Sequence, residues 1–402
     1  MNYHLLLSCV FISILSFGSS AGVTGFTVQE LTTFFSGIHQ FSAKFSEILA
    51  NNEKDNLIAS PISVLITSAM LCYGADGETR QELEAALNLP MNEVYIMKLF
   101  YNFIGNLNNA TNVELHLANA LFLNNNFKIK DIFRKVSINI FKSTINNQLN
   151  FQNAKRSAGI INSWCRKNTG IPKIIEAGDL NQAKLVMINA IYFKGDWENS
   201  FDSHETISFH ISNTNSVPIK MMCRLGEYNS DKILNGAAEY IELPYKTDEP
   251  NNKLSMYVIL PVGNNRLDDI IDKLFKIEFV KLNSKKFETQ LCMPKFEIES
   301  NLDLIPVLKK MGISSMFRDS ANFSRMTDDN VKISKIIQKA FISVDENGSE
   351  AAAVTGVSIL PLSMNRPRVI IVDKPFISVI VSKATGTPLF WARVDDPRSL
   401  YN

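Results

Sequence analysis

The sequence predicts a mixed α+β fold in which helices and strands occupy different parts of the chain. Four helix-like patterns come first, between about residues 31 and 107, and most strand-like runs follow residue 185. The two kinds of element do not alternate regularly, as they would in a doubly wound parallel sheet. With 402 residues, 46% of them hydrophobic, the chain is long enough to bury a large core.

The helices are predicted from apolar spacing and from capping residues. Ser60 followed by Pro61 is typical of a helix start, because serine caps free N–H groups and proline fits the first helical position. Thr79 with Glu82 predicts a capping box for the next helix. Apolar residues recurring at helical spacing predict helices over about 31–49, 61–74, 79–88, 94–107, 131–141 and 154–167.

The strands are predicted from alternation and from continuous apolar runs. Residues 113–123 begin by alternating, and residues 185–193 are apolar almost throughout, which is typical of a strand buried on both faces. Further strands are predicted over 254–260, 287–299, 333–344, 369–372, 376–381 and 388–394.

Residues 1–21 are predicted to be a secretory signal peptide. An apolar core from Leu5 to Leu15 is followed by small residues that end at Ala21, although His4 stands where a lysine or arginine is usual. We therefore expect a secreted protein whose folded domain comprises residues 22–402. No other run is long enough to cross a bilayer, and the net charge of +1 predicts no nucleic-acid or membrane partner.

Cysteine usage leaves two alternatives open. Without residues 1–21 the chain keeps Cys72, Cys165, Cys223 and Cys292, far apart and without zinc-like spacing. A secreted chain can carry disulfides, but a core of this size does not require them. We expect buried free thiols.

No catalytic or metal-binding motif stands out. The sequence lacks a nucleophile elbow, a P-loop, a dinucleotide fingerprint and a zinc-protease motif. His39 and His116 fit packing or surface roles, and His204 with His210 has no third metal ligand at strand or helix spacing. We therefore expect neither enzyme activity nor a cofactor.

One uncharged stretch near the C-terminus is unusual. Residues 351–365 carry no charge, yet Gly356 and Pro361 break any helical pattern. Alternate residues from Ser349 to Ile359 are small or apolar, so one face of a strand could bury them. The stretch is compatible with a loop and with a strand.

Several separated motifs resemble those of the serpins, the serine protease inhibitor family. The matching segments span nearly the whole chain after residue 21 and occur in the family's order: 60–63, 73–79, 189–197, 346–355, 372–376 and 389–394. The resemblance implies a single domain of about nine helices and three β-sheets with an exposed reactive-centre loop. It also implies an inhibitor that traps a serine protease as a covalent acyl-enzyme when the cut loop inserts into the main sheet.

The resemblance assigns functional residues by position. The family's spacing from Glu346 places the reactive bond at Leu362–Ser363, with Leu360 or Met364 as the attacked residue if the loop spacing differs. Leucine suits a chymotrypsin-like, elastase-like or cathepsin-like pocket. The hinge comprises Glu346, Gly348, Ser349, Glu350, Ala351, Ala352, Ala353, Val354 and Thr355, and the sheet-opening region comprises Ser60, Ser63, Asn189, Trp197 and Gln338.

The chain departs from the family at two places. Gln338 stands where a histidine is usual, and because glutamine both donates and accepts, we expect it to contact Asn189 or the cap at Ser60 and Ser63. The helix at 94–107 has Lys98 as its only base, so no heparin site is expected there. We expect a monomer.

Three sequons are present, at Asn109, Asn322 and Asn347. The third adjoins the hinge, where a glycan would obstruct insertion. We expect Asn347 to be unmodified, or modified only in a fraction that does not inhibit. A non-inhibitory serpin, acting as a carrier or storage protein, is the alternative function.

Overall fold

The structure, a computed structural model, describes residues 26–89, 92–108, 113–249, 252–282, 285–347 and 367–398. The predicted signal peptide, the sequon at Asn109, the hinge from Gly348 to Thr355 and the predicted reactive bond at Leu362–Ser363 lie outside these residues. No described helix combines the length and the apolarity that crossing a bilayer requires.

Eight α-helices lie within the described residues, against about nine expected from the resemblance. They are α2 (Val28–Asn52), α3 (Pro61–Gly74), α4 (Gly77–Leu87), α5 (Glu93–Asn108), α6 (Asp131–Asn139), α7 (Ala154–Thr169), α8 (Leu267–Leu274) and α9 (Ile305–Lys310). The first six confirm the helical patterns, and Ser60 caps α3 as predicted, because its hydroxyl accepts a hydrogen bond from the backbone N–H of Ser63.

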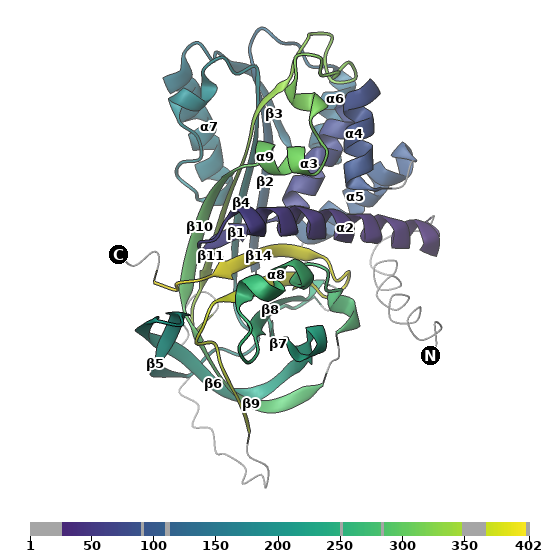
Figure 1. Cartoon of the computed structure of the whole chain (residues 1–402). Coiled ribbons are helices and arrows are strands. Elements are labelled where there is room, and N and C mark those ends of the chain that lie inside the picture. Colours follow the sequence, from purple (N-terminus) through teal and green to yellow (C-terminus); the bar gives the residue numbers. More distant parts are fainter. Residues whose placement is uncertain are drawn as a thin grey trace.

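One sheet has five strands and contains the strands that matter for function. Its order is β10 (Phe296–Asp303), β11 (Ile333–Val344), β4 (Leu185–Gly195), β2 (Val113–Asn124) and β3 (Thr144–Leu149). Figure 1 shows α7 on one side of this sheet and helices α3 to α6 on the other. The strand β4 is buried on both faces, as its apolar run predicts, with Val186 and Ile188 toward α7 and Met187 and Ile191 toward the other core.

The other nine strands form a second connected sheet, most of which lies below α2 in Figure 1. The order is β1 (Leu57–Ala59), β14 (Pro388–Val394), β13 (Phe376–Ser382), β8 (Leu254–Pro261), β7 (Ala238–Pro244), β6 (Asn215–Ile233), β9 (Lys286–Pro294) and β12 (Arg368–Ile371), and β5 (Ser203–Ser212) also pairs with β6. Because β6 pairs with β7 at one end and with β5 and β9 along the rest, it joins two strand sets. Together with the five-stranded sheet these sets account for the three sheets expected.

Two sequence predictions about element boundaries are wrong. Thr79 does not cap its helix, which begins at Gly77 with Asp76 as the N-cap; the Thr79 hydroxyl instead accepts a hydrogen bond from the Asn322 backbone N–H at 3.0 Å. The run 287–299 is not one strand but two, β9 and β10, which lie in different sheets. Pro294 ends β9, and the break leaves Lys295 at the junction between the sheets.

The prediction of four free thiols is wrong for two of the cysteines. Cys223 on β6 and Cys292 on β9 stand directly opposite each other in the antiparallel register, with their Cα atoms 4.2 Å apart, and form a disulfide. Such close Cα atoms are typical of the narrow pairs in an antiparallel ladder, where side chains approach most closely. Cys72 and Cys165 are free and buried, as expected.

Candidate sheet-opening site and loop anchor

The segment after β11 connects the two sheets. β11 ends at Val344 inside the five-stranded sheet, and the next described strand, β12, begins at Arg368 on the edge of the nine-stranded sheet. The predicted hinge and reactive bond fall on this connection, residues 345–367. The described ends of the connection therefore show what holds the predicted loop.

β11 and β4 pair directly and in parallel, from Ile333 opposite Leu185 to Ile342 opposite Phe193. Their other neighbours, β10 and β2, pair antiparallel with them. A chain that folded back after β11 would run antiparallel to β11 and therefore antiparallel to β4. Inserted between them, such a strand would replace one parallel ladder by two antiparallel ladders, and antiparallel pairing is slightly more stable per residue.

Three amide side chains lie in one row across this sheet, on the face toward α3. Gln338 on β11 is opposite Asn189 on β4, which is opposite Asn119 on β2. The Gln338 Nε2 donates to the Asn189 Oδ1 at 2.8 Å, and the Asn189 Nδ2 donates to the Asn119 Oδ1. The first of these bonds crosses the parallel pair, so separating β11 from β4 would break it.

The first two turns of α3 bind the same amide row. Gln338 accepts from the Ser60 backbone N–H at 2.9 Å and donates to the Ser60 carbonyl at 3.0 Å, which ties β11 to the helix cap. Asn189 donates to the Ser63 hydroxyl, and the hydroxyls of Ser63 and Thr67 both donate to the Asn119 Oδ1. The contacts predicted for Gln338 are therefore present.

Burial makes this polar cluster sensitive to substitution. Ser60, Ser63, Asn189 and Gln338 are fully buried, and Asn119 is almost fully buried. A buried polar group that loses its partner costs about 1 to 3 kcal/mol, which is more than a hydrogen bond contributes on average. The closed sheet is therefore held by bonds that an apolar residue cannot replace.

Trp197 holds the chain where it leaves β11. Its indole Nε1 donates to the Asp345 carbonyl at 2.9 Å, and its backbone N–H donates to the Asn347 carbonyl at 3.1 Å. The ring is buried and stacks on Tyr245, with ring centroids 4.6 Å apart. The backbone N–H of Phe201 donates to the carbonyl of the intervening residue, Glu346, at 2.8 Å. Consecutive carbonyls at the start of the connection are thus fixed.

The side chain of Glu346 is held by two further groups. Its Oε1 lies 2.5 Å from the Nε2 of His204 on β5 and 3.0 Å from the Nζ of Lys295 between β9 and β10. Partial burial raises the pKa of Glu346, but the hydrogen bonds from His204 and Lys295 outweigh it and lower the pKa to about 2. We call Trp197, Phe201, His204, Lys295 and Glu346 the loop anchor.

Sequence reasoning missed several members of these two sites. Asn119 and Thr67 could be found only once the strand register placed Asn119 opposite Asn189. His204 is 142 positions from Glu346, and Lys295 is 51 positions away. The sequence carries no local signal for these pairs, and its pattern suggests no role for His204 other than that of a metal ligand.

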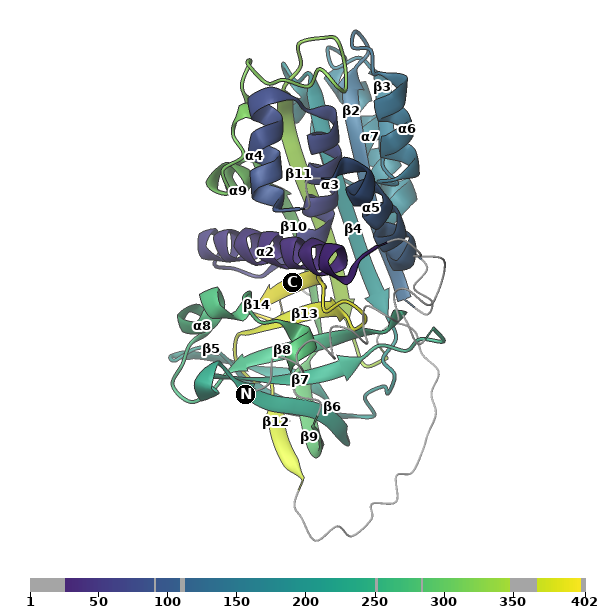
Figure 2. The ribbon, with the colours of Figure 1, turned by 90° about the vertical axis from the view of Figure 1, so that its right-hand side faces the viewer.

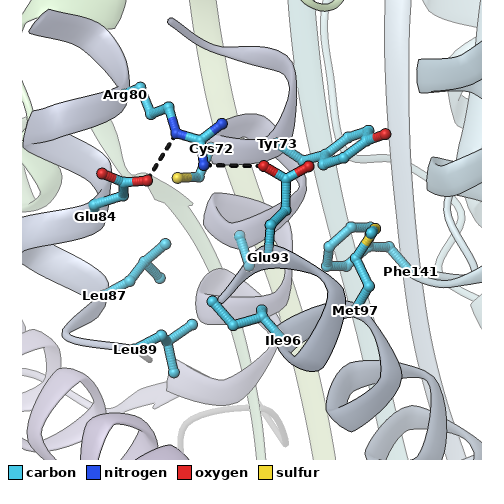
Figure 3. A pocket seen from close by; sticks show the side chains of 11 residues that line it. Cys72, Tyr73, Arg80, Glu84, Leu87, Leu89, Glu93, Ile96, Met97 and Phe141 are labelled. Carbon is cyan, nitrogen blue, oxygen red and sulfur yellow. Dashed lines mark hydrogen bonds and ion pairs between the residues drawn. The ribbon is translucent and has the colours of Figure 1, made fainter. Parts of the chain in front are cut away.

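A pocket lies between α3, α4 and α5 (Figure 3). Its wall is mainly apolar, and the guanidinium of Arg80 is paired with the carboxylates of Glu84 and Glu93, at 2.7 and 3.0 Å. Burial raises the pKa of the Cys72 thiol to about 12, so this cysteine is not a nucleophile at neutral pH.

The described residues include one close group of possible metal ligands, Glu205 with Cys223 and Cys292. Because the two sulfurs are bonded to each other, they cannot act as thiolate ligands. His204 and His210 lie six residues apart on β5, about 20 Å along an extended strand, so their rings are too far apart to share one ion.

Two of the three predicted sequons are described. The side chain of Asn322 is exposed, and its Oδ1 accepts from the backbone N–H of Ser324 at 3.0 Å. Asn347 is half-buried, and its backbone N–H donates to the Asp345 carboxylate while its carbonyl accepts from Trp197. A glycan on Asn347 would therefore sit beside the loop anchor.

Comparison with known proteins gives consistent results. The family model described as "Serpin (serine protease inhibitor)" matches residues 36–397. Antichymotrypsin-2 of Bombyx mori is 32% identical over 368 residues, which cover 88% of this chain and 96% of that protein. Human neuroserpin is 31% identical over 376 residues, 89% of this chain and 90% of the relative.

Solved structures agree over a similar extent. Serpin48 of the insect Tenebrio molitor, described as highly specific, superposes with a TM-score of 0.81 at 28% identity, over 91% of this chain and 98% of that chain. Human thyroxine-binding globulin complexed with its hormone superposes with a TM-score of 0.80 at 26% identity, over 92% and 99% of the two chains. The neighbours thus include a serpin described as highly specific and a globulin named for binding thyroxine.

Proposed function

The chain belongs to the serpin family, and we propose that it is a suicide-substrate inhibitor of serine proteases that are either chymotrypsin-like or elastase- or cathepsin-like. In this proposal the protease attacks the loop at Leu362–Ser363 and forms an acyl-enzyme. The severed loop then inserts between β11 and β4 before the acyl bond is hydrolysed. Members of the family act as inhibitors of serine proteases and not as enzymes in the usual sense.

The parallel pairing of β11 with β4 carries the proposal. An antiparallel strand that continues β11 would fit between these two strands. The amide row that holds the sheet closed crosses the same pair of strands. Adjacent strands lie about 4.8 Å apart, so insertion would move β11 and β4 to roughly twice that distance. The Gln338–Asn189 bond would break, whereas the Asn189–Asn119 bond would remain.

The hydrogen bonds of the two new ladders would stabilise the inserted state by far more than the loss of the Gln338–Asn189 bond destabilises it. About a dozen inserted residues would gain hydrogen bonds contributing roughly 1 kcal/mol each, and would bury one apolar face. Insertion would therefore release free energy on the order of 10 to 20 kcal/mol, which suffices to displace a tethered protease and distort its active site. Misplacing reacting groups by about 1 Å can slow a reaction on the order of 100-fold.

Loop composition supports the inhibitory function over storage or transport. The hinge residues that would face inward, Ser349, Ala351, Ala353 and Thr355, are small and uncharged, so they could enter the sheet without leaving a buried charge. Leu362 fits an apolar specificity pocket, whereas a trypsin-like pocket would favour arginine or lysine. Gln338 makes its contacts with hydrogen bonds that can re-form, and we propose that it allows the sheet to open.

The setting of this function is also proposed. Residues 1–21 direct secretion, residues 22–402 form one domain that acts as a monomer, and Asn109 and Asn322 carry glycans while Asn347 does not. The helix α5 contains a single base, Lys98, so the inhibition rate should not rise steeply with heparin.

A hormone or metabolite carrier is the second candidate, favoured by the similarity to thyroxine-binding globulin. The deciding experiment is to incubate the secreted protein with chymotrypsin, elastase and trypsin. We expect a complex with chymotrypsin or elastase that survives SDS, and a released C-terminal peptide that begins at Ser363. Clean cleavage by all three enzymes without such a complex would favour the carrier or storage function. Intact-mass analysis of the complex would show whether Asn347 carries a glycan.

A further inference from the structure

The outer edge of β2 is uncovered over its first half. β2 pairs with β4 from Val113 onward, but β3 pairs with β2 only from Ala120, which stands opposite Thr144. On this edge residues 113–119 have no strand partner among the described residues. Figure 2 shows β2 and β3 grouped with α6 and α7 on one side of the molecule. An unpaired edge presents backbone N–H groups that a ligand can use.

A cavity of about 200 Å³ lies along this edge, and we call it the edge cavity. It is lined by residues 115–119, Lys142, Thr144, Trp164 and Asn168. This space far exceeds that of one water molecule, so the cavity can hold a small organic ligand. None of the lining side chains is a carboxylate, and Lys142 supplies a positive charge. Lys142 is exposed and forms no ion pair within the described chain; its Nζ lies 5.1 Å from the ring centroid of Tyr101.

Asn119 has an unpaired donor at the edge cavity. Its Oδ1 accepts from the Asn189 Nδ2 and from the hydroxyls of Ser63 and Thr67. These partners lie on β4 and α3, so the planar carboxamide directs the Nδ2 of Asn119 the other way, toward the open edge of β2. Asn119 is only 4% exposed, and its Nδ2 donates to no group among the described residues. An acceptor in the cavity would complete its hydrogen bonding.

The amide row makes this donor suitable for an anion. The Ser60 backbone N–H donates to the Gln338 Oε1, and the Gln338 Nε2 donates to the Asn189 Oδ1. The Asn189 Nδ2 then donates to the Asn119 Oδ1. Each amide thus accepts and donates in the same direction, so the positive end of the row lies at the Asn119 Nδ2. Aligned hydrogen bonds polarise one another, and the positive end of aligned amides favours negative charge, as at a helix N-terminus.

The other walls favour an organic anion over an inorganic one. Leu117 and Trp164 are half-buried and line the cavity, so an apolar stem could cover their surface. A carboxylate on such a stem would place its charge near Asn119 and Lys142. The Thr144 hydroxyl accepts from the Trp164 Nε1 at 3.2 Å, and its own proton can bind the second carboxylate oxygen.

We propose that the edge cavity binds a small organic carboxylate, and that this ligand stabilises the closed form of the main sheet. The amide row is continuous only while β11 and β4 are paired, because insertion would break its Gln338–Asn189 bond. The ligand therefore binds the closed sheet more tightly, and by reciprocity it favours closure. The binding site stands on the described residues alone, whereas its effect on the lifetime of the inhibitor rests on the proposed function.

The test titrates the protein with benzoate by calorimetry, at constant ionic strength, with benzamide as the neutral analogue. We expect a dissociation constant on the order of 0.1 to 1 mM for benzoate and at least about 10-fold weaker binding of benzamide. Benzoate at about ten times its dissociation constant should raise the unfolding temperature by about 1 to 2 °C. Equal binding of the two compounds, or no binding of benzoate at about 20 mM, would overturn the proposal.

Two variants test the cavity and the amide row separately. Lys142→Gln should weaken benzoate binding at least about 5-fold without lowering the unfolding temperature of the free protein, because Lys142 is exposed. The matched control is Lys220→Gln, an exposed lysine on β6, which should leave the affinity unchanged. Gln338→Met interrupts the row outside the cavity and should weaken binding about 2- to 5-fold.

Unchanged affinity in Lys142→Gln would overturn the site, and unchanged affinity in Gln338→Met would overturn its coupling to the sheet. Incubation at 37 °C tests the consequence: benzoate should slow the loss of inhibitory activity in the wild type and not in Lys142→Gln. An equal loss with and without benzoate in the wild type would contradict the stabilised closed sheet.

The outcomes for this site and for the proposed function are distinguishable. If benzoate binds and raises the unfolding temperature but no protease forms an SDS-stable complex, the inhibitory function fails and the site remains. If such complexes form normally and benzoate does not bind, the edge-cavity proposal alone fails.

Discussion

At the scale of single residues, Gln338 decides how firmly the main sheet is closed. Gln338→Met preserves the side-chain volume but leaves the Ser60 N–H and carbonyl and the Asn189 Oδ1 without their bonds. Because these groups are buried, we expect the free energy of unfolding to fall by about 2 to 4 kcal/mol. The variant should also lose inhibitory activity faster during incubation at 37 °C, because its closed sheet is weaker.

The matched variant for this position is Gln338→His, which can still donate and accept. It should retain most of the stability and of the inhibition. Thermal unfolding and residual inhibition after incubation measure the two effects. Unchanged stability and inhibition in Gln338→Ala or Gln338→Met would show that the side chain does not hold the sheet.

Glu346 makes the loop anchor dependent on pH. Its folded pKa of about 2 lies below the ordinary value of 4.5, so its contribution to stability is present above about pH 4.5 and is lost as the pH falls toward 2. We expect Glu346→Gln to lower the unfolding temperature by about 1 to 3 °C at pH 7 and to have little effect near pH 2.

The control for Glu346 is Asp328→Asn. This residue also pairs with a lysine, Lys130 at 2.6 Å, but it is 89% exposed, so its removal should have a smaller effect at pH 7. Thermal unfolding between pH 2 and 7 compares the two variants. An equal destabilisation by Glu346→Gln at both ends of this range would contradict the charged interaction.

At the scale of elements, substitutions in the hinge and substitutions at the predicted reactive bond should impair inhibition in different ways. Ala353→Glu would place a charge on the face that has to be buried, so insertion should slow and most encounters should end in a cleaved inhibitor and an active protease. Leu362→Arg should leave insertion intact and shift the preference toward trypsin-like enzymes. Gel electrophoresis of the products and the stoichiometry of inhibition distinguish the outcomes.

Two results would contradict this division of the loop. One is a normal stoichiometry of inhibition in Ala353→Glu, and the other is an unchanged target preference in Leu362→Arg. Val354→Glu is a suitable control for the first variant, because the neighbouring residue should face away from the sheet after insertion.

The disulfide between β6 and β9 should contribute measurably to stability. It closes a loop with a sequence separation of 69, for which the chain-entropy relation gives about 4 kcal/mol. Cys223→Ser with Cys292→Ser should therefore lower the free energy of unfolding by up to that amount. In the chain without residues 1–21, thiol labelling after unfolding should find two groups without reductant and four with it. Four groups without reductant would contradict the disulfide.

Elements were predictable where local pattern determines them. The spacing of apolar residues in α2, the Ser60–Pro61 start of α3 and the apolar run of β4 all lie within short windows. The long strand β6 is not predicted, because its burial follows no single period and its pairing changes along its length. The helix α9, of six residues, is too short to show a period.

At the scale of the whole molecule, the sites depend on contacts that no local window contains. The family resemblance located Gln338, Asn189 and Trp197, but the amide row required the register of three strands. The loop anchor joins β5, the segment after β11 and the β9–β10 junction, and the disulfide joins β6 to β9. Pairs such as these arise from topology, so composition and spacing could not identify the free and bonded cysteines.

The position of β12 also has a consequence for the way in which the chain acquires its fold. The strands β12, β13 and β14 are the last to leave the ribosome, and until β12 pairs with β9 the downstream end of residues 345–367 has no fixed point. During synthesis and early folding, the connection 345–367 could therefore insert between β11 and β4 before β12 has docked. In the proposed mechanism the closed sheet would be reached only if the four-residue strand β12 docks first, so the active state would be selected by the order of folding events and not by free energy alone.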